Sequence, residues 1–345
     1  MSILIVGHGL AGATLAYQLY KKGVDFTIVS GNKPTASRVA AGMINPIVFR
    51  RLNKSWAVEE CLPFMHTFYK ELERDLQSEF YYNVAISKLL SQEEFDFWTN
   101  KISEDNTLTS YLADPSDAIS ERGLKPFYGS GIVNKGGYVD LNVMLDALQQ
   151  KWKALDCFIE ATINYDDFVA SENSCTWKGK EYTKVVFCEG VGVTDNPFFD
   201  LEMMKPVKGE LLTIYSEELP QDKILNKNMF VLPVGNHYFK VGATYNWQDL
   251  SERNTNEALE ELKLKLEKII DVPYKVVNQH AGVRPTVKDR RPILGYNNNF
   301  RSVAIFNGLG AKGVMLAPYF SALMVDSILN SADIPIEVNV KRFER

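Results

Sequence analysis

Apolar and polar positions at the start of the chain follow the pattern of a β-strand, a helix and a second β-strand. Residues 3–6 form a continuous apolar run, residues 7–12 are rich in glycine, and residues 25–29, Asp-Phe-Thr-Ile-Val, again have the composition of a strand. The helix expected between them, to about Lys22, carries an apolar stripe at the 3.6-residue helical period. The pattern predicts a βαβ unit and therefore a parallel sheet.

Two further apolar runs, at residues 184–188 and 303–306, are followed by glycines and predict that the parallel sheet continues far downstream. The chain between them differs, because short runs rich in aromatic and β-branched residues alternate with turns. These runs are residues 211–215, 229–233 and 238–244. They favour an antiparallel sheet, and the charged segments at residues 59–79 and 256–270 are expected to form helices.

The two patterns together predict an α/β fold in which one domain interrupts another. We expect a Rossmann-like cofactor-binding domain built on the parallel sheet, interrupted by a mainly antiparallel α+β substrate domain. The cofactor-binding domain is expected to comprise residues 1–80, 137–200 and 276–345, and the substrate domain residues 81–136 and 201–275. Two domains are also what 345 residues suggest, at about 150 residues per domain.

Composition narrows the range of functions. The chain has 38 basic and 43 acidic residues, a net charge of -5 and 46% hydrophobic residues, which excludes a disordered chain and gives no general attraction to nucleic acid. Four cysteines without a CxxC spacing predict free thiols in a reducing cytoplasm and no metal site. The most apolar stretch, residues 313–329, is interrupted by Asp326, so no membrane association is expected.

Gly7, Gly9 and Gly12 have the spacing of a dinucleotide-binding fingerprint, and they lie between a predicted strand and a predicted helix. Gly7 permits the tight turn, Gly9 lets a pyrophosphate approach the backbone, and Gly12 lets the helix pack on the strand. The structural alternative is a glycine turn that binds nothing. The strand before it and the helix after it favour a nucleotide site.

Two further features belong to the expected nucleotide site. Leu10 and Ala11 open the helix, so that the anion faces its positive end. The fingerprint normally has an acidic residue for the ribose about twenty residues later, and this chain has Ser30 there, whose hydroxyl makes a weaker hydrogen bond than a carboxylate. These residues alone also suit a nicotinamide-dependent dehydrogenase.

Residues 36–46, Ala-Ser-Arg-Val-Ala-Ala-Gly-Met-Ile-Asn-Pro, resemble the flavin-wrapping segment of the D-amino-acid oxidase superfamily of FAD-dependent oxidoreductases, nearest in pattern to glycine oxidase and sarcosine oxidase. Further segments resemble the family, in the family's order, along nearly the whole chain. They are residues 136–140, 206–211, 241–244, 281–286, 292–295 and 307–318. The resemblance implies the family's fold and FAD as the cofactor.

The resemblance also implies which residues hold the flavin, besides the glycine turn. One group wraps the flavin and contacts the adenine, and the adenine contact is expected from a strand at residues 161–163. This group is Ser37, Ala41, Gly42, Met43 and Ile163. The other group forms the C-terminal flavin loop and helix start: Gly310, Ala311, Lys312, Gly313 and Val314. A helix starting there presents a second positive end, which suits the negative charge of reduced flavin. Neither the wrapping segment nor the loop contains Cys or His, so non-covalent FAD is expected.

Five residues are the candidates for the substrate side. Arg284 resembles the family's arginine that binds the substrate carboxylate with both arms of its guanidinium, and the alternative is a surface salt bridge. Tyr245 and Asn45 are expected to wall the pocket, and Phe230 stands where relatives often carry a tyrosine that also touches the carboxylate. Lys240 resembles a sarcosine-oxidase lysine that assists reaction with oxygen, and the alternative is a lysine on an exposed sheet face.

The function that the resemblance implies is oxidation of the C–N bond of an amine or amino acid to an imine, by hydride transfer to flavin N5. The expected partners are a small-molecule substrate and oxygen or another electron acceptor. One alternative is FAD-dependent oxidation of an aminomethyl-uridine side chain in tRNA, which the acidic net charge disfavours. The others are an NAD-dependent dehydrogenase, which leaves the later segments unexplained, and a flavin-binding protein without catalysis.

Overall fold

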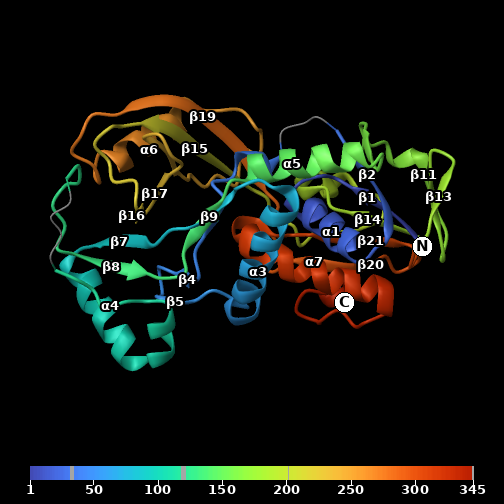
Figure 1. Cartoon of the computed structure of the whole chain (residues 1–345), viewed down its shortest axis with the longest axis horizontal. Helices are drawn as coiled ribbons and strands as arrows, with labels where there is room; N and C mark the ends of the chain where they lie inside the picture. Colours follow the sequence, from blue (N-terminus) through green and yellow to red (C-terminus); the bar gives the residue numbers. More distant parts are fainter. Residues whose placement is uncertain (32–34, 118–121, 201, 344–345) are drawn as a thin grey trace.

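The computed structural model describes residues 1–31, 35–117, 122–200 and 202–343. Two sheets organise this part of the chain, and they lie side by side along the long axis of the molecule (Figure 1). One sheet has six strands and the other has seven. The predicted α/β fold, with a parallel sheet joined to a mainly antiparallel one, is confirmed.

The six-stranded sheet has the strand order β10-β2-β1-β14-β21-β20. Its strands are β1 (Ser2–Val6), β2 (Asp25–Ser30), β10 (Phe158–Glu160), β14 (Lys184–Phe187), β20 (Ile293–Tyr296) and β21 (Val303–Asn307). Neighbouring strands are parallel, except that β20 runs antiparallel to β21. Residues 3–6 of β1 are fully buried, as in a sheet covered on both faces.

Helices cover this sheet and bring distant parts of the chain together. They are α1 (Leu10–Lys21), α3 (Val58–Leu76), α5 (Leu141–Ala154) and α7 (Gly313–Asn330). The first helix of the chain, α1, packs against α7, which is nearly the last element, and α3 packs against the other side of the α7 surface. The two helices that follow glycine-rich turns, α1 and α7, therefore lie against each other beside the six-stranded sheet.

The seven-stranded sheet has the order β19-β15-β18-β17-β16-β7-β8. Its strands are β7 (Ile86–Leu90), β8 (Gly129–Val133), β15 (Val207–Tyr215), β16 (Ile224–Asn226), β17 (Phe230–Pro233), β18 (Tyr238–Gly242) and β19 (Lys275–Arg284). Neighbours are antiparallel except β16 and β7. Helix α6 (Asn256–Leu266) packs on it through Leu262 and Leu266, which share a buried cluster with Leu212 and Phe239.

The remaining elements complete the described chain. The remaining helices are α2 (Ala36–Val39) and α4 (Gln92–Glu104). The 3-10 turns are η1 (Asn106–Ser110), η2 (Tyr165–Asp167), η3 (Gly190–Asp195), η4 (Gly310–Lys312) and η5 (Val340–Phe343). Two further sheets are β3 (Met43–Ile44) with β9 (Gly137–Val139) and β6 (Tyr81–Asn83), and β11 (Phe168–Ala170) with β12 (Cys175–Trp177) and β13 (Lys180–Tyr182). A last pair is β4 (Ile47–Val48) with β5 (Asn53–Lys54).

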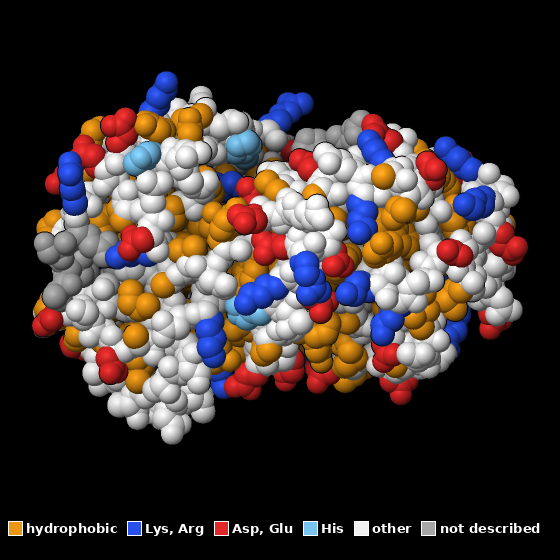
Figure 2. All heavy atoms as spheres, in the orientation of Figure 1, with side chains coloured by type: hydrophobic (Ala, Val, Ile, Leu, Met, Phe, Trp, Pro, Cys, Tyr) orange, Lys and Arg blue, Asp and Glu red, His pale blue; other side chains and the backbone are white. Residues whose placement is uncertain are grey.

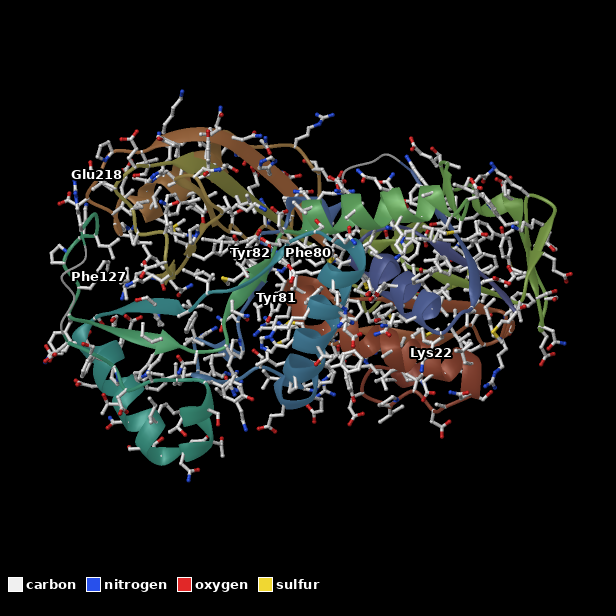
Figure 3. All side chains as sticks on the ribbon, viewed as in Figure 1. Lys22, Phe80, Tyr81, Tyr82, Phe127 and Glu218 are labelled. Atoms are coloured by element: carbon white, nitrogen blue, oxygen red, sulfur yellow. The ribbon has the colours of Figure 1, made fainter. Side chains whose placement is uncertain are left out.

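The β3-β9-β6 sheet lies between the two large sheets, where Phe80, Tyr81 and Tyr82 gather (Figure 3). Phe80 is fully buried, and the ring of Tyr82 stacks on Tyr138 of β9 at a centroid distance of 4.8 Å. In the same view Lys22 lies in the lobe of the six-stranded sheet, whereas Glu218 lies in the lobe of the seven-stranded sheet. Aromatic packing therefore joins the two lobes at their centre.

Two predicted boundaries differ from the structure. The strand expected at residues 161–163 is wrong, because β10 ends at Glu160; only the N–H of Ala161 still donates to the Ser30 carbonyl oxygen, at 3.1 Å. Residues 276–284, assigned from the sequence to the cofactor-binding domain, belong to β19 in the seven-stranded sheet. The division of the whole chain into domains stays a prediction.

The C-terminal helical segment Gly310–Asn330 is long and apolar enough to span a membrane by length and composition alone. However, 67% of its most apolar window is buried inside the protein, as in a helix that belongs to the core. The four cysteines are free, as predicted. Among the described residues, no group of His, Cys, Asp and Glu is arranged to hold a metal ion.

Candidate active site

The turn between β1 and α1 brings the fingerprint glycines together. Gly7 has a φ of +103°, a left-handed conformation that favours glycine. A Cβ at Gly12 would lie 1.9 Å from the carbonyl oxygen of Gly7, so helix and strand pack too closely for any side chain there. Gly7 and Gly12 are therefore required by the backbone conformation and packing of the fold, independently of any ligand.

Gly9 differs from both. Its φ of -79° is open to any residue, and a Cβ there would meet only the Ser37 hydroxyl, at 3.3 Å. Packing within the chain therefore does not demand glycine at this position. An uncrowded backbone at the N-terminus of α1, where the first N–H groups have no acceptor within the helix, fits the pyrophosphate of FAD.

Two serines predicted to hold the cofactor reach this helix start. The Ser37 hydroxyl accepts a hydrogen bond from the N–H of Leu10 at 2.9 Å, and the Ser30 hydroxyl accepts one from the N–H of His8 at 3.3 Å. Both come from outside the turn, Ser30 from the end of β2 and Ser37 from α2. The structure thus assembles the glycine turn, Leu10, Ser30 and Ser37 into one site.

Two buried polar atoms at this site have no hydrogen-bond partner in the described chain: Nε2 of His8 and the hydroxyl of Thr35. Burial, and to a lesser extent the charge of Arg38, lowers the pKa of His8 to about 3, so the ring is neutral. Unpaired buried polar groups are rare, and a bound group that pairs with them removes the cost. Neither residue is recognisable from the sequence, because neither His8 nor Thr35 is one of the fingerprint glycines.

The second predicted helix start meets the first. Gly310, Ala311 and Lys312 form the turn η4, and Gly313 and Val314 open α7. A Cβ at Gly313 would lie 3.0 Å from Cδ2 of Leu10, so the two helix starts touch. Two positive helix ends at one place fit a cofactor with a negatively charged pyrophosphate and, once reduced, a negatively charged ring.

Lys312 is tied to the wrapping segment. Its Nζ donates to the carbonyl oxygen of Asn45 at 3.2 Å and contacts the hydroxyl of Ser55. Burial lowers the pKa of Lys312 to about 8. The Asn45 side chain accepts from the N–H of Ile47 at 2.9 Å, so Asn45 shapes a turn and supplies Lys312 with an acceptor.

The wrapping segment lies between the two large sheets. Ser37 bonds to α1 on one side, while Nζ of Lys240 on β18 donates to the carbonyl oxygen of Ala40 at 3.4 Å on the other. Gly42 accepts from the N–H of Val139 at 3.0 Å, and Met43 pairs with Tyr138. Ala41, which precedes them, is buried. Lys240 is half-buried and contacts the wrapping segment, so it does not lie on an exposed sheet face, and its burial lowers its pKa.

Arg284 ends β19, and its guanidinium lies across Gly209 of the neighbouring strand, where a Cβ would be 2.1 Å from Nη2. It donates to the carbonyl oxygens of Thr244 (3.4 Å from Nη1, 3.5 Å from Nη2) and Lys208 (3.5 Å), and its Cζ lies 4.6 Å from the centroid of the Tyr245 ring. Burial lowers its pKa. Among the described residues, no carboxylate forms an ion pair with Arg284. The alternative role of Arg284 in a surface salt bridge is therefore excluded for this part of the chain.

Some of the predicted site residues lie far from one another. Lys240 pairs with Thr213 of β15, whereas Arg284 pairs with Val207 of the same strand. At about 3.3 Å per residue their backbones are roughly 20 Å apart along the strand. Ile163 packs against a buried cluster that contains Val29 of β2, at the far end of the six-stranded sheet from the substrate residues.

Two residues that the sequence did not single out belong to the site's surroundings. Glu189 follows β14, and a Cβ at Gly7 would lie 3.5 Å from its Cα. Burial raises the pKa of Glu189 to about 7, against hydrogen bonds from Asn196 and Tyr165. Its position at the carboxyl end of a parallel strand was the available signal. The other residue, Trp247, stacks on Tyr245.

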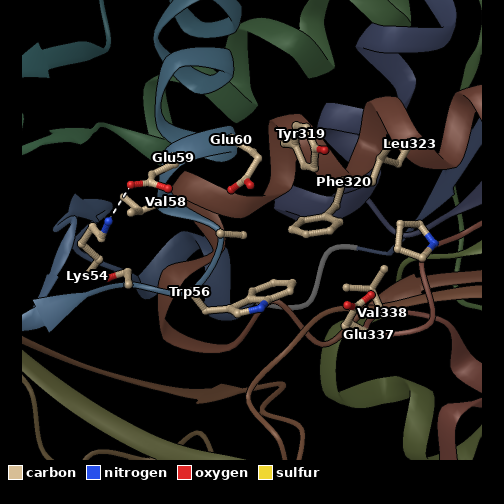
Figure 4. Close-up of a pocket in the computed structure, with 13 residues that line it drawn as sticks. Lys54, Trp56, Val58, Glu59, Glu60, Tyr319, Phe320, Leu323, Glu337 and Val338 are labelled. Carbon is tan, nitrogen blue, oxygen red and sulfur yellow. Dashed lines mark hydrogen bonds and ion pairs between the residues drawn. The ribbon is translucent and has the colours of Figure 1, made fainter. Parts of the chain in front are cut away.

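A surface pocket elsewhere is not this site. It lies between the start of α3 and α7, where Trp56 and Phe320 stack at 5.5 Å and Lys54 pairs with Glu59 at 2.6 Å (Figure 4). None of the residues predicted to bind the cofactor or substrate lines it. The candidate active site is therefore the junction of the two helix starts, the wrapping segment and the seven-stranded sheet.

A Rossmann-like sheet with two glycine-rich helix starts, joined to a mainly antiparallel sheet that presents a half-buried arginine, is the arrangement expected of a flavin-dependent oxidoreductase. Residues 2–327 match the family described as FAD dependent oxidoreductase, and the chain belongs to that family. It is an oxidoreductase whose cofactor is FAD, which confirms the resemblance.

Individual relatives agree with this assignment. Glycine oxidase of Bacillus subtilis (strain 168) is 31% identical over 128 residues, which is 36% of this chain and only 35% of that enzyme. An uncharacterized oxidoreductase of the same organism, YurR, is 22% identical over 95% of both chains. Among solved structures, glycine oxidase from Geobacillus kaustophilus has a TM-score of 0.80 at 20% identity over 96% of this chain and 95% of its own. L-proline dehydrogenase from P.horikoshii also reaches 0.80, at 15% identity over 100% and 98%.

Proposed function

We propose that this enzyme oxidises the C–N bond of an amine or amino acid to an imine, and that Arg284 binds the carboxylate of its substrate. The observation that carries the proposal is a half-buried guanidinium held by carbonyl oxygens, with no carboxylate partner in the described chain. A buried charge is costly without a counterion, and a substrate carboxylate supplies one. The names of similar proteins, glycine oxidase and L-proline dehydrogenase, support the substrate class.

The chain's own residues orient the reactants. The two helix starts and the wrapping segment would hold FAD, which would supply the acceptor for a hydride from the substrate carbon next to nitrogen. Arg284 fixes the carboxylate, while the Tyr245 ring covers the guanidinium and keeps water from that side. Phe230 supplies no hydroxyl, so the carboxylate depends on Arg284 for its charged contact.

Charge distribution supports a small substrate over a nucleic acid. On the face seen in Figure 2, basic and acidic side chains intermingle without a continuous basic stripe. Phosphate contacts need clustered Lys and Arg. The aminomethyl-uridine alternative therefore has no specific observation in its favour.

Replacement of Arg284 tests the proposal. Arg284→Ala should cost about 2 to 5 kcal/mol of transition-state binding, and Arg284→Lys, which keeps the charge and loses the fork, should recover part of it. The measurement is the rate of anaerobic flavin reduction against concentration of whichever amino acid reduces the enzyme. Arg291→Ala, at an arginine that stacks on Trp56, is the control. Equal rates and saturation in all variants, with equal flavin content, would show that Arg284 is structural.

A further inference from the structure

An exposed pair of aromatic rings lies beside Arg284. Tyr245 is 58% exposed and Trp247 64% exposed, and their rings stack at a centroid distance of 6.1 Å with 25° between their planes. The Arg284 guanidinium lies 4.6 Å from the Tyr245 ring. The three side chains form a row that begins with a half-buried guanidinium and ends with an exposed indole.

The segment that carries the rings is anchored. Asn246, between them, exchanges both backbone hydrogen bonds with Lys208, at 2.9 and 3.0 Å, and its side-chain oxygen accepts from the N–H groups of Gln248 and Asp249. The buried Lys208 ammonium then holds Asp249 at 2.5 Å and the carbonyl oxygen of Arg253 at 2.5 Å. The exposure of the rings is therefore fixed by the fold.

Such an arrangement needs a physical reason. Single apolar side chains on a surface are ordinary, but this exposed stacked pair lies beside a half-buried guanidinium that has no carboxylate partner among the described residues. Apolar area is therefore left in water where the chain also offers an ion-binding group. Aromatic faces bind other planar rings in offset stacks. A ligand that has both a carboxylate and a planar ring would satisfy the two features together.

We propose that Tyr245 and Trp247 form a stacking platform for a planar ring of the substrate. The inference rests on the proposed function, because it takes the carboxylate to be bound by Arg284. It deepens that function by naming the substrate class: an amino acid or amine-bearing acid with an aromatic or heteroaromatic ring a few bonds from its carboxylate. Phe230, an apolar ring that packs on Gly242 of β18, adds no competing polar contact.

The platform is tested by isothermal titration calorimetry of the FAD-loaded protein with two carboxylates that have the same number of carbon atoms. Phenylacetate has a planar ring, whereas cyclohexylacetate has a bulkier and more apolar one without a π face. If hydrophobic burial alone drove binding, cyclohexylacetate would bind at least as tightly. Stacking predicts that phenylacetate binds about two- to tenfold more tightly.

Substitutions at Tyr245 and Trp247 distinguish the contribution of the aromatic ring from that of side-chain size. Trp247→Leu and Tyr245→Leu should remove the preference for phenylacetate, while Trp247→Phe should keep most of it. Tyr238→Leu, at an exposed tyrosine that begins β18, the strand preceding the platform segment, is the matched control and should leave the preference unchanged. Trp247→Phe also guards against loss of the fold, because it preserves an aromatic ring in the anchored segment.

Each outcome bears on one proposal or on both. An unchanged preference in Trp247→Leu, with binding lost in Arg284→Ala, overturns the platform and leaves the carboxylate site standing. Binding of neither carboxylate to the wild-type protein overturns both proposals. A change of oligomeric state in Trp247→Leu, seen by light scattering, or displacement of phenylacetate by a short oligouridylate, would overturn the small-molecule platform in favour of a protein or RNA contact.

Discussion

Burial decides what each charged residue of the site can do. Arg284 is half-buried, is held by carbonyl oxygens and keeps its guanidinium free for an anion. In contrast, the fully buried Lys208 is neutralised within the chain by Glu210 at 3.4 Å and Asp249 at 2.5 Å. Lys312 is intermediate, because its acceptors among the described residues are two neutral groups, the Asn45 carbonyl and the Ser55 hydroxyl. A buried charge that the chain leaves unpaired is the one to assign to a ligand.

Glu189 gives the protein a pH-dependent stability. Its pKa is about 7 in the folded chain against an ordinary 4.5, because it is buried. Between these two values the unfolded chain has released the proton and the folded chain still holds it, so the free energy of unfolding falls as pH rises from about 4.5 to 7. Above pH 7 the penalty is complete and constant.

Glu189→Gln should remove this penalty. Relative to wild type, the variant should gain on the order of 2 kcal/mol in the free energy of unfolding between pH 5 and pH 8. The measurement is urea denaturation of both proteins, at matched FAD content, across that range. Glu172→Gln, at an exposed carboxyl, should follow the wild-type curve. Parallel curves for wild type and Glu189→Gln would contradict the raised pKa.

Sequence alone could identify the residues whose role depends on local spacing. Gly7, Gly9 and Gly12 follow from the turn and helix around them, and Arg284 follows from its place in a family motif. Glu189 and Trp247 could not be recognised, because their roles depend on which strands become neighbours: Glu189 matters since β14 lies next to β1, and Trp247 since Lys208 of β15 pairs with Asn246.

At the scale of elements, the β1–α1 turn separates two kinds of glycine. Gly12→Val should destabilise the fold itself, because its side chain would meet the Gly7 carbonyl. Gly9→Val should leave the fold intact, since only the Ser37 hydroxyl is near, and should abolish FAD binding because its methyls fill the space of the pyrophosphate. Far-UV circular dichroism measures the first effect and the flavin absorbance of the purified protein the second.

Two outcomes for Gly9→Val and Gly12→Val would contradict these expectations. A Gly9→Val protein that purifies with full flavin content would remove the basis for placing FAD at this turn. If Gly9→Val unfolds as readily as Gly12→Val, Gly9 serves packing, contrary to the open backbone seen around it.

Elements buried on both faces were easier to predict than edge strands. The runs of β1, β14 and β21 are continuously apolar, because both sheet faces are covered. In contrast β19 is an edge strand, and residues 275–280 are mostly exposed or half-buried and carry Asn, Gln and His. With no hydrophobic alternation, the sequence predicted only its last residues, through the motif around Arg284.

At the scale of the whole molecule, the wrapping segment joins both large sheets, through Ser37 to α1 and through Lys240 to β18. FAD bound there stabilises the two sheets together, and bound ligand raises stability by mass action. Since residues 36–43 and 308–313 contain no Cys or His, the flavin should be held non-covalently.

Acid precipitation should therefore release a yellow supernatant and a colourless pellet. The thermal midpoint of the FAD-depleted protein should lie below that of the FAD-loaded protein and rise with added FAD. Absorbance of the two fractions and calorimetric scans provide the measurements. Colour that stays with the denatured pellet would mean a covalent bond to the flavin.

The central claim is that this chain is an FAD-dependent enzyme that takes a hydride from the carbon next to an amine nitrogen. Its most direct test is the visible absorbance of the purified, FAD-loaded protein under anaerobic conditions during titration with a panel of amines and amino acids. We predict bleaching of the flavin bands by at least one amino acid and recovery of the bands when oxygen or another acceptor is admitted. Flavin bands that no amine or amino acid bleaches, but that NADH does, would contradict the claim.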